Sequence, residues 1–325
     1  MYKLSRPLQE TLAAPALLAA AFLYSGPAGA APPATDLDCT KCVESAELLP
    51  GIIGPRELAD DAVFVTTVLV RADGTPEDNC NALLDALVDT SIATETDPYL
   101  IKLEPGIYNC PFPLLVEMNS YVDIEGSGQN TTIIRGHRDP VVEMAAHSEL
   151  RQVTVDAHGL FPEGVEMRYT DTRLADVTVI ANIGKPGSIP LGVQIGSAVP
   201  NPNQPAEIDL DHVTVRAGLD GKLDPFNPSY GTAIKVGGLV IVHMTDVHAK
   251  AANSALGLVS LNSARVVATG SVFQGAGVSM WVETTNTAVM VSSQLIGPLG
   301  IISGVARCIS SYNFLYNDLN PDCTP

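Results

Sequence analysis

Four side chains that could transfer protons or hold a cation fall in matching positions of a repeated pattern. They are Asp176, His212, Asp246 and His248. A row of carboxylate, imidazole and carboxylate could form a proton-transfer site or bind a divalent cation. Opposite charges on a protein surface also form solvated ladders, which contribute only about 0–1 kcal/mol for each pair. We therefore take these four residues as catalytic candidates, and a solvated ladder as the preferred alternative.

A second group of acidic residues surrounds the candidate histidine. Asp211 directly precedes His212, and Asp220 and Asp224 lie in a short segment that contains Gly221. Carboxylates at this spacing could bind a ligand or Ca²⁺, but an aspartate followed by glycine is also ordinary turn chemistry. We expect a turn, keep these three aspartates as binding candidates, and predict no other metal site and no cofactor.

The positions of these residues come from an internal repeat of eight residues. Its first position is Leu or Met, its fourth is Val, and its last is Ala. The copies span residues 150–157, 174–181, 210–217 and 244–251, and the valines are Val153, Val177, Val213 and Val247. A period of two places the valines on one face and the candidate residues on the other. If the copies stack about 4.8 Å apart, His212 lies between Asp176 and Asp246, with His248 diagonally near.

A second, looser strand pattern recurs between these copies, at residues 164–167, 192–195, 231–234, 277–280 and 300–303. One strand of each kind in every repeat predicts an all-β solenoid, the right-handed parallel β-helix. A leucine-rich horseshoe needs a helical period that is missing after residue 100, and a β-sandwich would show no fixed register. The surplus residues in 182–207 and 218–230 are rich in Pro, Gly and Asn, so we predict loops there, flanking any functional face.

The two ends of such a coil need covers. Residues 78–91 have the apolar periodicity of a short amphipathic helix that Asp78 could cap, and residues 316–325 could cover the other end. The predicted domains are a signal peptide in residues 1–30, an extended leader or stalk in 31–77, and the β-helix in 78–325.

The chain resembles the pectin-lyase-like superfamily, and in particular bacterial secreted right-handed β-helix repeat proteins. Residues 101–108, 122–128 and 131–136 carry the likeness, and they look like the first coil of the pectinesterase branch. The resemblance implies the fold. The catalytic motifs of that branch are not matched, because Thr170 stands where the motif around residues 169–172 has a glutamine.

Export is predicted from the first thirty residues. Lys3 and Arg6 precede an apolar stretch at 12–23, which is too short to span a membrane, and Ala28-Gly29-Ala30 fits a cleavage site. No later stretch approaches the length of a membrane span. We expect a secreted protein, extracellular or periplasmic.

All six cysteines lie after the predicted signal peptide, in a compartment that favours disulfides. Six cysteines allow fifteen pairings, and we predict the sequence-local set. The pairs are Cys39–Cys42, Cys80–Cys110 and Cys308–Cys323. Half of a zinc site or a redox motif is the alternative for Cys39 and Cys42, but a single pair at this spacing is a weak signal.

The charge balance limits the partners. A formal net charge of −18 makes nucleic acid an unsuitable partner and argues against anionic polysaccharides. With no complete catalytic motif, we expect a non-catalytic protein that binds an extracellular or cell-surface glycan. The alternatives are a polysaccharide lyase, esterase or glycoside hydrolase with a divergent site, and a structural part of an extracellular assembly that oligomerises through the leader.

Overall fold

The structure is a computed structural model in which we describe the backbone of twelve segments. These are residues 66–159, 162–182, 190–196, 205–218, 231–251, 256–261, 264–275, 278–282, 286–297, 299–301, 305–313 and 317–323. The predicted signal peptide, residues 31–65 of the predicted leader, Cys39, Cys42, Asp220 and Asp224 lie outside the described residues.

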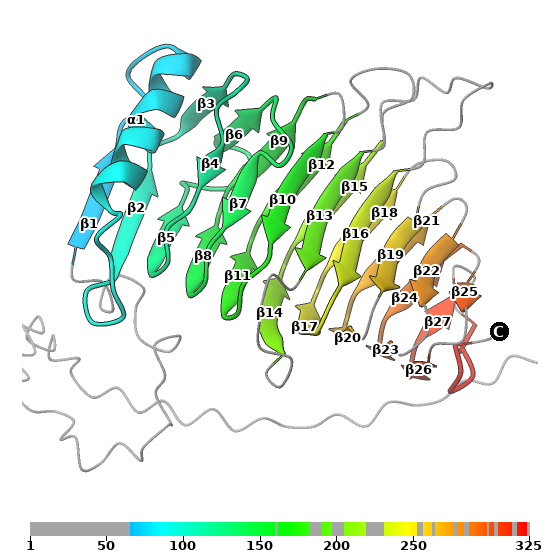
Figure 1. The fold of residues 1–325 in the computed structure, drawn as a ribbon. Helices are drawn as coiled ribbons and strands as arrows, with labels where there is room; N and C mark the ends of the chain where they lie inside the picture. The colour runs from blue at the N-terminus through cyan, green and yellow to red at the C-terminus, as the bar shows by residue number, and fades with distance from the viewer. Residues whose placement is uncertain are drawn as a thin grey trace, which may run out of the picture. The chain divides into compact units, whose positions relative to one another are not determined.

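Three parallel sheets run along the molecule, and each turn of the coil contributes one strand to each sheet (Figure 1). The ten-stranded sheet consists of β1 (Thr66–Val70), β2 (Tyr99–Leu103), β5 (Val122–Glu125), β8 (Ser148–Arg151), β11 (Thr172–Ala175), β14 (Ala206–Asp211), β17 (Val240–Thr245), β20 (Arg265–Thr269), β23 (Thr287–Val291) and β26 (Val305–Ile309). The nine-stranded sheet consists of β3 (Gly106–Cys110), β6 (Thr132–Gly136), β9 (Thr154–Ala157), β12 (Thr178–Ala181), β15 (Thr214–Ala217), β18 (His248–Ala251), β21 (Val272–Gly275), β24 (Gln294–Ile296) and β27 (Tyr312–Asn313). The eight-stranded sheet consists of β4 (Val116–Glu117), β7 (Val142–Met144), β10 (Glu163–Met167), β13 (Leu191–Gly196), β16 (Thr232–Gly237), β19 (Leu256–Leu261), β22 (Val278–Val282) and β25 (Leu299–Ile301). The predicted right-handed parallel β-helix is confirmed.

The predicted valine ladder forms part of the core. Val153, Val177, Val213 and Val247 are each 0% exposed. Backbone bonds join successive rungs directly beside them, because the N–H of Thr178 donates to the carbonyl of Val153 and the N–H of Thr214 to that of Val177. The next rung repeats the bond, from His248 to Val213. The repeat therefore predicted the stacking correctly.

The eight-residue template is not one strand, however. It holds the end of a strand in the ten-stranded sheet, a sharp corner, and a complete four-residue strand of the nine-stranded sheet. The corner residues Gln152, Asp176, His212 and Asp246 have φ between +51° and +56°. Aspartate and histidine adopt this left-handed conformation more readily than most residues with a side chain. The polar residues at this position are therefore explained by backbone geometry.

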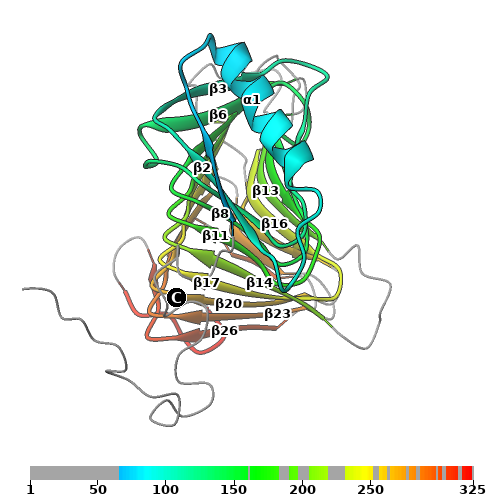
Figure 2. The same cartoon turned by 90° about the vertical axis from the view of Figure 1, so that its left-hand side faces the viewer.

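The predicted helix is α1, which spans Pro76–Asp89. Its N-cap is Thr75, whose hydroxyl accepts from the N–H of Asp78 at 3.2 Å, while the Asp78 carboxylate accepts from the N–H of Thr75 at 3.1 Å. Asp78 thus completes a capping box at the third helical position, so the prediction that it caps the helix itself was wrong by three residues. Figure 2, which looks at this end of the coil, shows α1 crossing in front of the strands.

The predicted boundary between leader and β-helix at residue 78 is too late in the chain. Thr66–Val70 forms β1, which pairs in parallel with β2 at the edge of the ten-stranded sheet. Its alternating burial, with Val70 buried and Leu69 54% exposed, is that of an edge strand. Among the described residues, no helix has the length and apolar character that crossing a membrane requires.

Two of the three predicted disulfides are confirmed, one at each end of the coil. Cys80–Cys110 joins α1 to β3 with a Cα–Cα distance of 5.4 Å, and Cys308–Cys323 joins β26 to the tail with a Cα–Cα distance of 5.0 Å. The tail also accepts and donates backbone hydrogen bonds, since the N–H of Leu319 donates to the carbonyl of Ser311. These contacts cover the last rung, as the sequence predicted.

In the later rungs, serines occupy the interior position that follows the corner. Ser271, Ser293 and Ser311 are each 0% exposed. The Ser271 hydroxyl accepts from the N–H of Val247 at 3.1 Å, that of Ser293 accepts from Ser271 at 3.2 Å, and that of Ser311 accepts from Ser293 at 3.2 Å. The valine ladder thus continues as a chain of buried hydrogen bonds.

Candidate functional site

A column of polar side chains runs along the outward face of the eight-stranded sheet. Its residues pair in register from one rung to the next, and we call them the polar column: Glu117, Glu143, Glu166, Gln194 and Lys235. Two rungs further in the same register lies Trp281, the single tryptophan of the chain. The spacing of parallel strands puts neighbouring members of the column about 4.8 Å apart.

Each strand places its column residue outward by placing both neighbours in the core. In β10, Val165 and Met167 on either side of Glu166 are 0% exposed. In β13, Val193 and Ile195 are buried on either side of Gln194. Alternation with a period of two therefore orients the polar side chain to the outside.

Two glycines let these strands approach the nine-stranded sheet. A Cβ atom on Gly164 would lie 2.3 Å from Cγ1 of Val179, and one on Gly192 would lie 2.2 Å from Cγ1 of Val215. Real side chains do not tolerate such distances, so β10 and β13 need glycine immediately before their inward valines.

Glu166 is held firmly at the centre of the column. Arg168 Nε lies 2.6 Å from Glu166 Oε1, and Gln194 Nε2 donates to the same oxygen at 2.8 Å. Glu166 is only 1% exposed, and its hydrogen bond raises the pKa of Arg168. Arg168 NH1 is also 4.0 Å from Glu143 Oε1. The arginine thus pairs with Glu166 and links two adjacent rungs.

Glu163, at the start of β10, has an unusually high pKa for a glutamate. Burial, together with the nearby charges of Glu166 and Asp139, raises the pKa of Glu163 from 4.5 to about 7, although Arg168 and Lys235 oppose the shift. Its Oε1 atom is buried and has no hydrogen-bond partner among the residues that the structure describes. Near neutral pH this carboxyl can therefore either donate or accept a proton. A neutral carboxyl beside an ionised one is the usual arrangement of an acid and base pair.

A hollow of about 320 Å³ lies where β4 and β7 carry the column. Glu117 and Glu143 line it together with Asn119, Ser120 and Tyr169. Tyr169 is 39% exposed. An aromatic ring beside hydrogen-bonding groups is suited to an amphipathic ligand with apolar and hydroxylated faces.

The structure brings together only some of the residues predicted as a site. His212 Nδ1 lies 2.9 Å from Asp211 Oδ1, and His212 Nε2 lies 3.5 Å from Asp246 Oδ2. The second carboxylate at His212 is thus that of Asp211 and not of Asp176, whose backbone N–H donates to the carbonyl of Asp211. With 58% of the His212 side chain exposed, the geometry favours the solvated ladder.

His248 does not share a face with the corner residues. It begins β18 in the nine-stranded sheet, whereas Asp176, His212 and Asp246 lie at the corner before that sheet. The prediction of one outward face for all four residues was wrong because the chain turns between them. Their catalytic role, and a binding role for Asp211, remain predictions.

Most residues of the two predicted loops lie outside the described part of the chain, but the strands that bound them are placed. The stretch 182–207 contains β13 and the start of β14, so it is not one loop. The first insertion lies between β12 and β13, and residues 218–230 lie between β15 and β16. The corner stands at the beginning of β12 and β15, and the insertions follow their ends. The insertions lead into the strands that carry Gln194 and Lys235 in the polar column.

Sequence reasoning missed the polar column, although its signal was present. The repeat at residues 164–167 and 192–195 was aligned correctly, and its middle position is Glu166 and Gln194. The third copy, residues 231–234, is two residues out of register with the structure. The structure pairs Val193 with Ile234 and Gln194 with Lys235. An alignment by the alternation of polar and apolar residues would have found Lys235.

The described part of the chain holds no group of three or more His, Cys, Asp or Glu side chains placed to bind a metal ion. The predicted calcium candidates Asp220 and Asp224 lie outside that part.

Comparison with known proteins yields similarity at the level of solved structures. No protein-family model matches the sequence, and no curated protein matches it. A pectin methylesterase from Erwinia chrysanthemi superposes with a TM-score of 0.49 at 11% identity, over 80% of this chain and 92% of that one. A pectin methylesterase from carrot has a TM-score of 0.47 at 13% identity, over 76% and 82%. The A-module of a mannuronan C-5 epimerase from Azotobacter vinelandii has a TM-score of 0.36 at 9% identity, over 78% and 98%.

These similarities are too distant to carry an argument about activity, and the three sheets in register establish the fold by themselves. The chain is a right-handed parallel β-helix, and its likeness to these proteins is one of fold alone.

Proposed function

We propose that the protein is secreted and binds an extracellular or cell-surface glycan along the polar column. The observation that carries the proposal is the register of the column, which places one hydrogen-bonding side chain in each of five successive rungs, with the buried Glu166 holding Arg168 and Gln194 in position. A row of donors and acceptors about 4.8 Å apart suits an extended polymer whose hydroxyl groups repeat along its length. Trp281 and Tyr169 add aromatic surface on the same sheet and beside it.

The charges of the column favour a neutral or amino-bearing glycan. Glu117, Glu143 and Glu166 supply three carboxylates, and Lys235 is the single basic member. Arg168 compensates Glu166 directly. Together with the net charge of −18, this balance repels a polyuronate. The glycan is therefore expected to lack a dense row of carboxylates.

A glycan array probed with the purified mature protein tests this proposal. We expect Lys235→Ala and Trp281→Ala each to weaken binding to the glycans that the array identifies by tenfold or more. Lys250→Ala is the matched control, because Lys250 is an exposed lysine of β18 in the nine-stranded sheet. Thermal unfolding of all three variants shows whether the fold is intact. Equal losses with Lys235→Ala and Lys250→Ala, or no bound glycan at all, would contradict the proposal.

Glu163 favours a second candidate function, a carbohydrate-active enzyme. A carboxyl with a pKa of about 7 can protonate a leaving group at neutral pH. The reaction class would be hydrolysis or elimination of a glycosidic bond, or hydrolysis of an ester on the glycan. Glu166 is shielded by Arg168 and Gln194, so binding without catalysis remains the function that the geometry supports best.

Assays for reducing ends, unsaturated products and released acyl or methyl groups separate the two candidates. If the protein is an enzyme, Glu163→Gln should lower its rate at least a hundredfold and leave glycan binding unchanged. Glu207→Gln is the control, since Glu207 is exposed on the ten-stranded sheet. If the protein binds a glycan but yields no product in any of the three assays, the enzymatic candidate is contradicted and the binding function is retained.

A further inference from the structure

The eight-stranded sheet ends in a strand edge that no described strand covers. β4 is the last strand of the sheet and pairs only with β7 among the described residues. The N–H groups of Val116 and Met118 donate to β7, at 3.1 Å to the carbonyl of Val141 and 2.9 Å to that of Glu143. Successive backbone groups of a strand point to opposite sides, so the N–H and C=O of Glu117 point away from the sheet. Such a free edge can pair with another extended chain.

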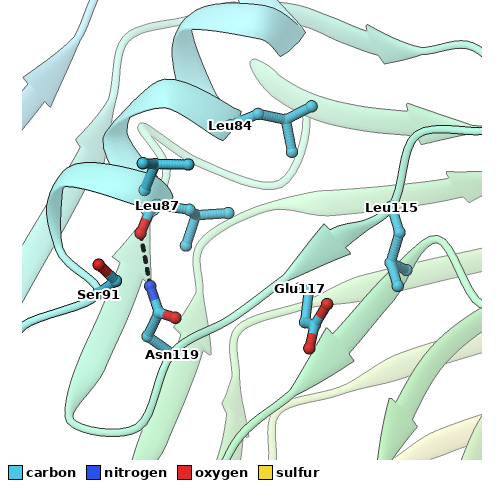
Figure 3. Close-up of a pocket in the computed structure, with 7 residues that line it drawn as sticks. Leu84, Leu87, Ser91, Leu115, Glu117 and Asn119 are labelled. Carbon is cyan, nitrogen blue, oxygen red and sulfur yellow. Dashed lines mark hydrogen bonds between the residues drawn. The ribbon is translucent and has the colours of Figure 1, made fainter.

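Helix α1 lies beside this edge and leaves a groove between them. The groove has a volume of about 380 Å³ and is lined by Leu84, Leu87 and Val88 of α1 and by Leu115, Glu117 and Asn119 of the β4 segment. Figure 3 shows the leucines of α1 facing Leu115 and Glu117 across the hollow. Asn119 Nδ2 donates to the carbonyl of Leu87 at 2.6 Å, which fixes the helix to the strand segment. The groove is therefore preformed.

The walls of the groove have two chemical characters. Val88 is 70% exposed on the helix side, and Ile92 just beyond the helix is 68% exposed. Glu117 is exposed on the strand side, and it pairs in register with Glu143 of the next rung. A chain in this groove meets apolar side chains on one side and carboxylates on the other.

We propose that the groove between α1 and β4 binds an extended peptide segment of a partner protein, with alternating apolar and basic side chains. The segment adds to the eight-stranded sheet beyond β4 through hydrogen bonds to the N–H and C=O of Glu117. Its apolar side chains contact Val88, Leu84 and Leu115, and a lysine or arginine pairs with Glu117. Strand addition of this kind takes its affinity from the main chain and its specificity from alternate side chains.

The negative charge of the protein determines which partner can bind in the groove. A second copy of this chain carries the same net charge of −18, so two copies repel each other, whereas a basic segment is attracted. The apolar wall and the backbone groups of a strand edge match a peptide better than a glycan. This site shares Glu117 with the polar column, but its apolar wall of Leu84, Val88 and Leu115 lies outside the column. Val88→Asn therefore tests peptide binding independently of glycan binding.

A blocked octapeptide of four Val-Lys repeats, labelled with a fluorophore, serves as the probe. Fluorescence anisotropy with the full chain should show saturable binding at physiological salt. The same peptide with N-methyl groups on alternate residues should bind at least tenfold more weakly, because it cannot pair with a strand edge. Octapeptides of Val-Glu and Thr-Lys repeats test the requirements for positive charge and apolar side chains.

Variants of the chain locate the binding. Glu117→Lys and Val88→Asn should each raise the Kd of the Val-Lys peptide at least tenfold. The matched controls are Glu207→Lys and Val305→Asn, which make the same changes at exposed positions of the ten-stranded sheet. No binding, equal binding of the N-methyl peptide, or equal effects of the control variants would overturn the proposal. Circular dichroism of every variant distinguishes a lost site from a lost fold.

Discussion

The outward faces of the ten-stranded and eight-stranded sheets both carry charged columns, but they use their charges differently. On the ten-stranded sheet, Arg151 is 5% exposed and lies 2.7 Å from Glu125, 3.6 Å from Asp123 and 3.6 Å from Glu149. Arg173 continues the network, at 3.0 Å from both Glu149 and Asp211. Arg151 and Arg173 are thus paired with carboxylates of their own and neighbouring rungs.

The pairing of charged groups on the eight-stranded sheet is less complete. Arg168 compensates Glu166, but Glu163 has a pKa raised to about 7 and a buried oxygen without a partner in the described structure. A face that satisfies its own charges stabilises the stack of rungs, and a face that leaves groups unsatisfied keeps them available for a ligand. The comparison therefore assigns structure to the first face and recognition to the second.

Removing Arg151 should produce the largest effect. Arg151→Ala removes the buried cation that Asp123, Glu125 and Glu149 share. Lys102 stays 3.5 Å from Glu125 and Arg173 stays 3.0 Å from Glu149, but the partly buried carboxylates lose their central partner, so we expect a loss of about 3–5 kcal/mol in the free energy of unfolding. Arg307→Ala, on the exposed outer face of β26 in the same sheet, should change it by less than about 0.5 kcal/mol. Urea unfolding at pH 7 measures both. Similar small changes in the two variants would show that the network on the ten-stranded sheet is not structural.

Glu163→Gln should stabilise the protein in a manner that depends on pH. The folded state raises the pKa of Glu163 from 4.5 to about 7, so it favours the neutral carboxyl. Below pH 4.5 the carboxyl is neutral in both states and the variant should match the wild type. As the pH rises through 7 the wild type loses stability, and at pH 8 the variant should be more stable by about 2–3 kcal/mol. Thermal unfolding at pH 4 and pH 8 tests this, and an equal difference at both values would refute it.

Substitutions of His212 should change stability least. They test whether the charge network of the ten-stranded sheet extends to this corner. If the corner conformation explains this residue, His212→Asn should leave stability within about 0.5 kcal/mol, since asparagine accepts a positive φ. His212→Val should lose about 1–2 kcal/mol, because a β-branched residue resists the φ of +52°. If the ion pairs with Asp211 and Asp246 matter more, both variants should lose the same amount in chemical denaturation.

The sequence contained enough to predict the stack of rungs. Val153, Val177, Val213 and Val247 recur at one position of a template, and a repeated apolar residue in a solenoid must meet its own copies. The disulfides at Cys80 and Cys308 followed from the need to close both ends. The helix was predicted as well, although its capping box begins at Thr75 and not at Asp78.

The candidate site could not be predicted in the same way. Periodicity shows that a residue is polar and outward, but not which sheet it belongs to. The chain passes from one sheet to the next at the corner of Asp176 and His212, in the middle of the template, so residues that periodicity assigned to one face lie at a corner and in a strand. Glu163 owes its raised pKa first to burial and then to the charges of Glu166 and Asp139, and Asp139 is 24 residues away in the sequence. Such a shift depends on the coil being assembled.

The serine ladder of the later rungs makes the C-terminal half of the coil cooperative along its axis. In a solenoid, each rung is stabilised mainly by its immediate neighbours, as in a one-dimensional chain of coupled units. Here the coupling includes a buried donor, since the N–H of Ser293 is satisfied only when the hydroxyl of Ser311 is in place. Loss of the final rung would leave that N–H unpaired at a cost of about 1–3 kcal/mol and expose the next hydroxyl in turn. Fraying from this end is therefore opposed at each rung of the serine ladder. The last turn stabilises the turns that precede it.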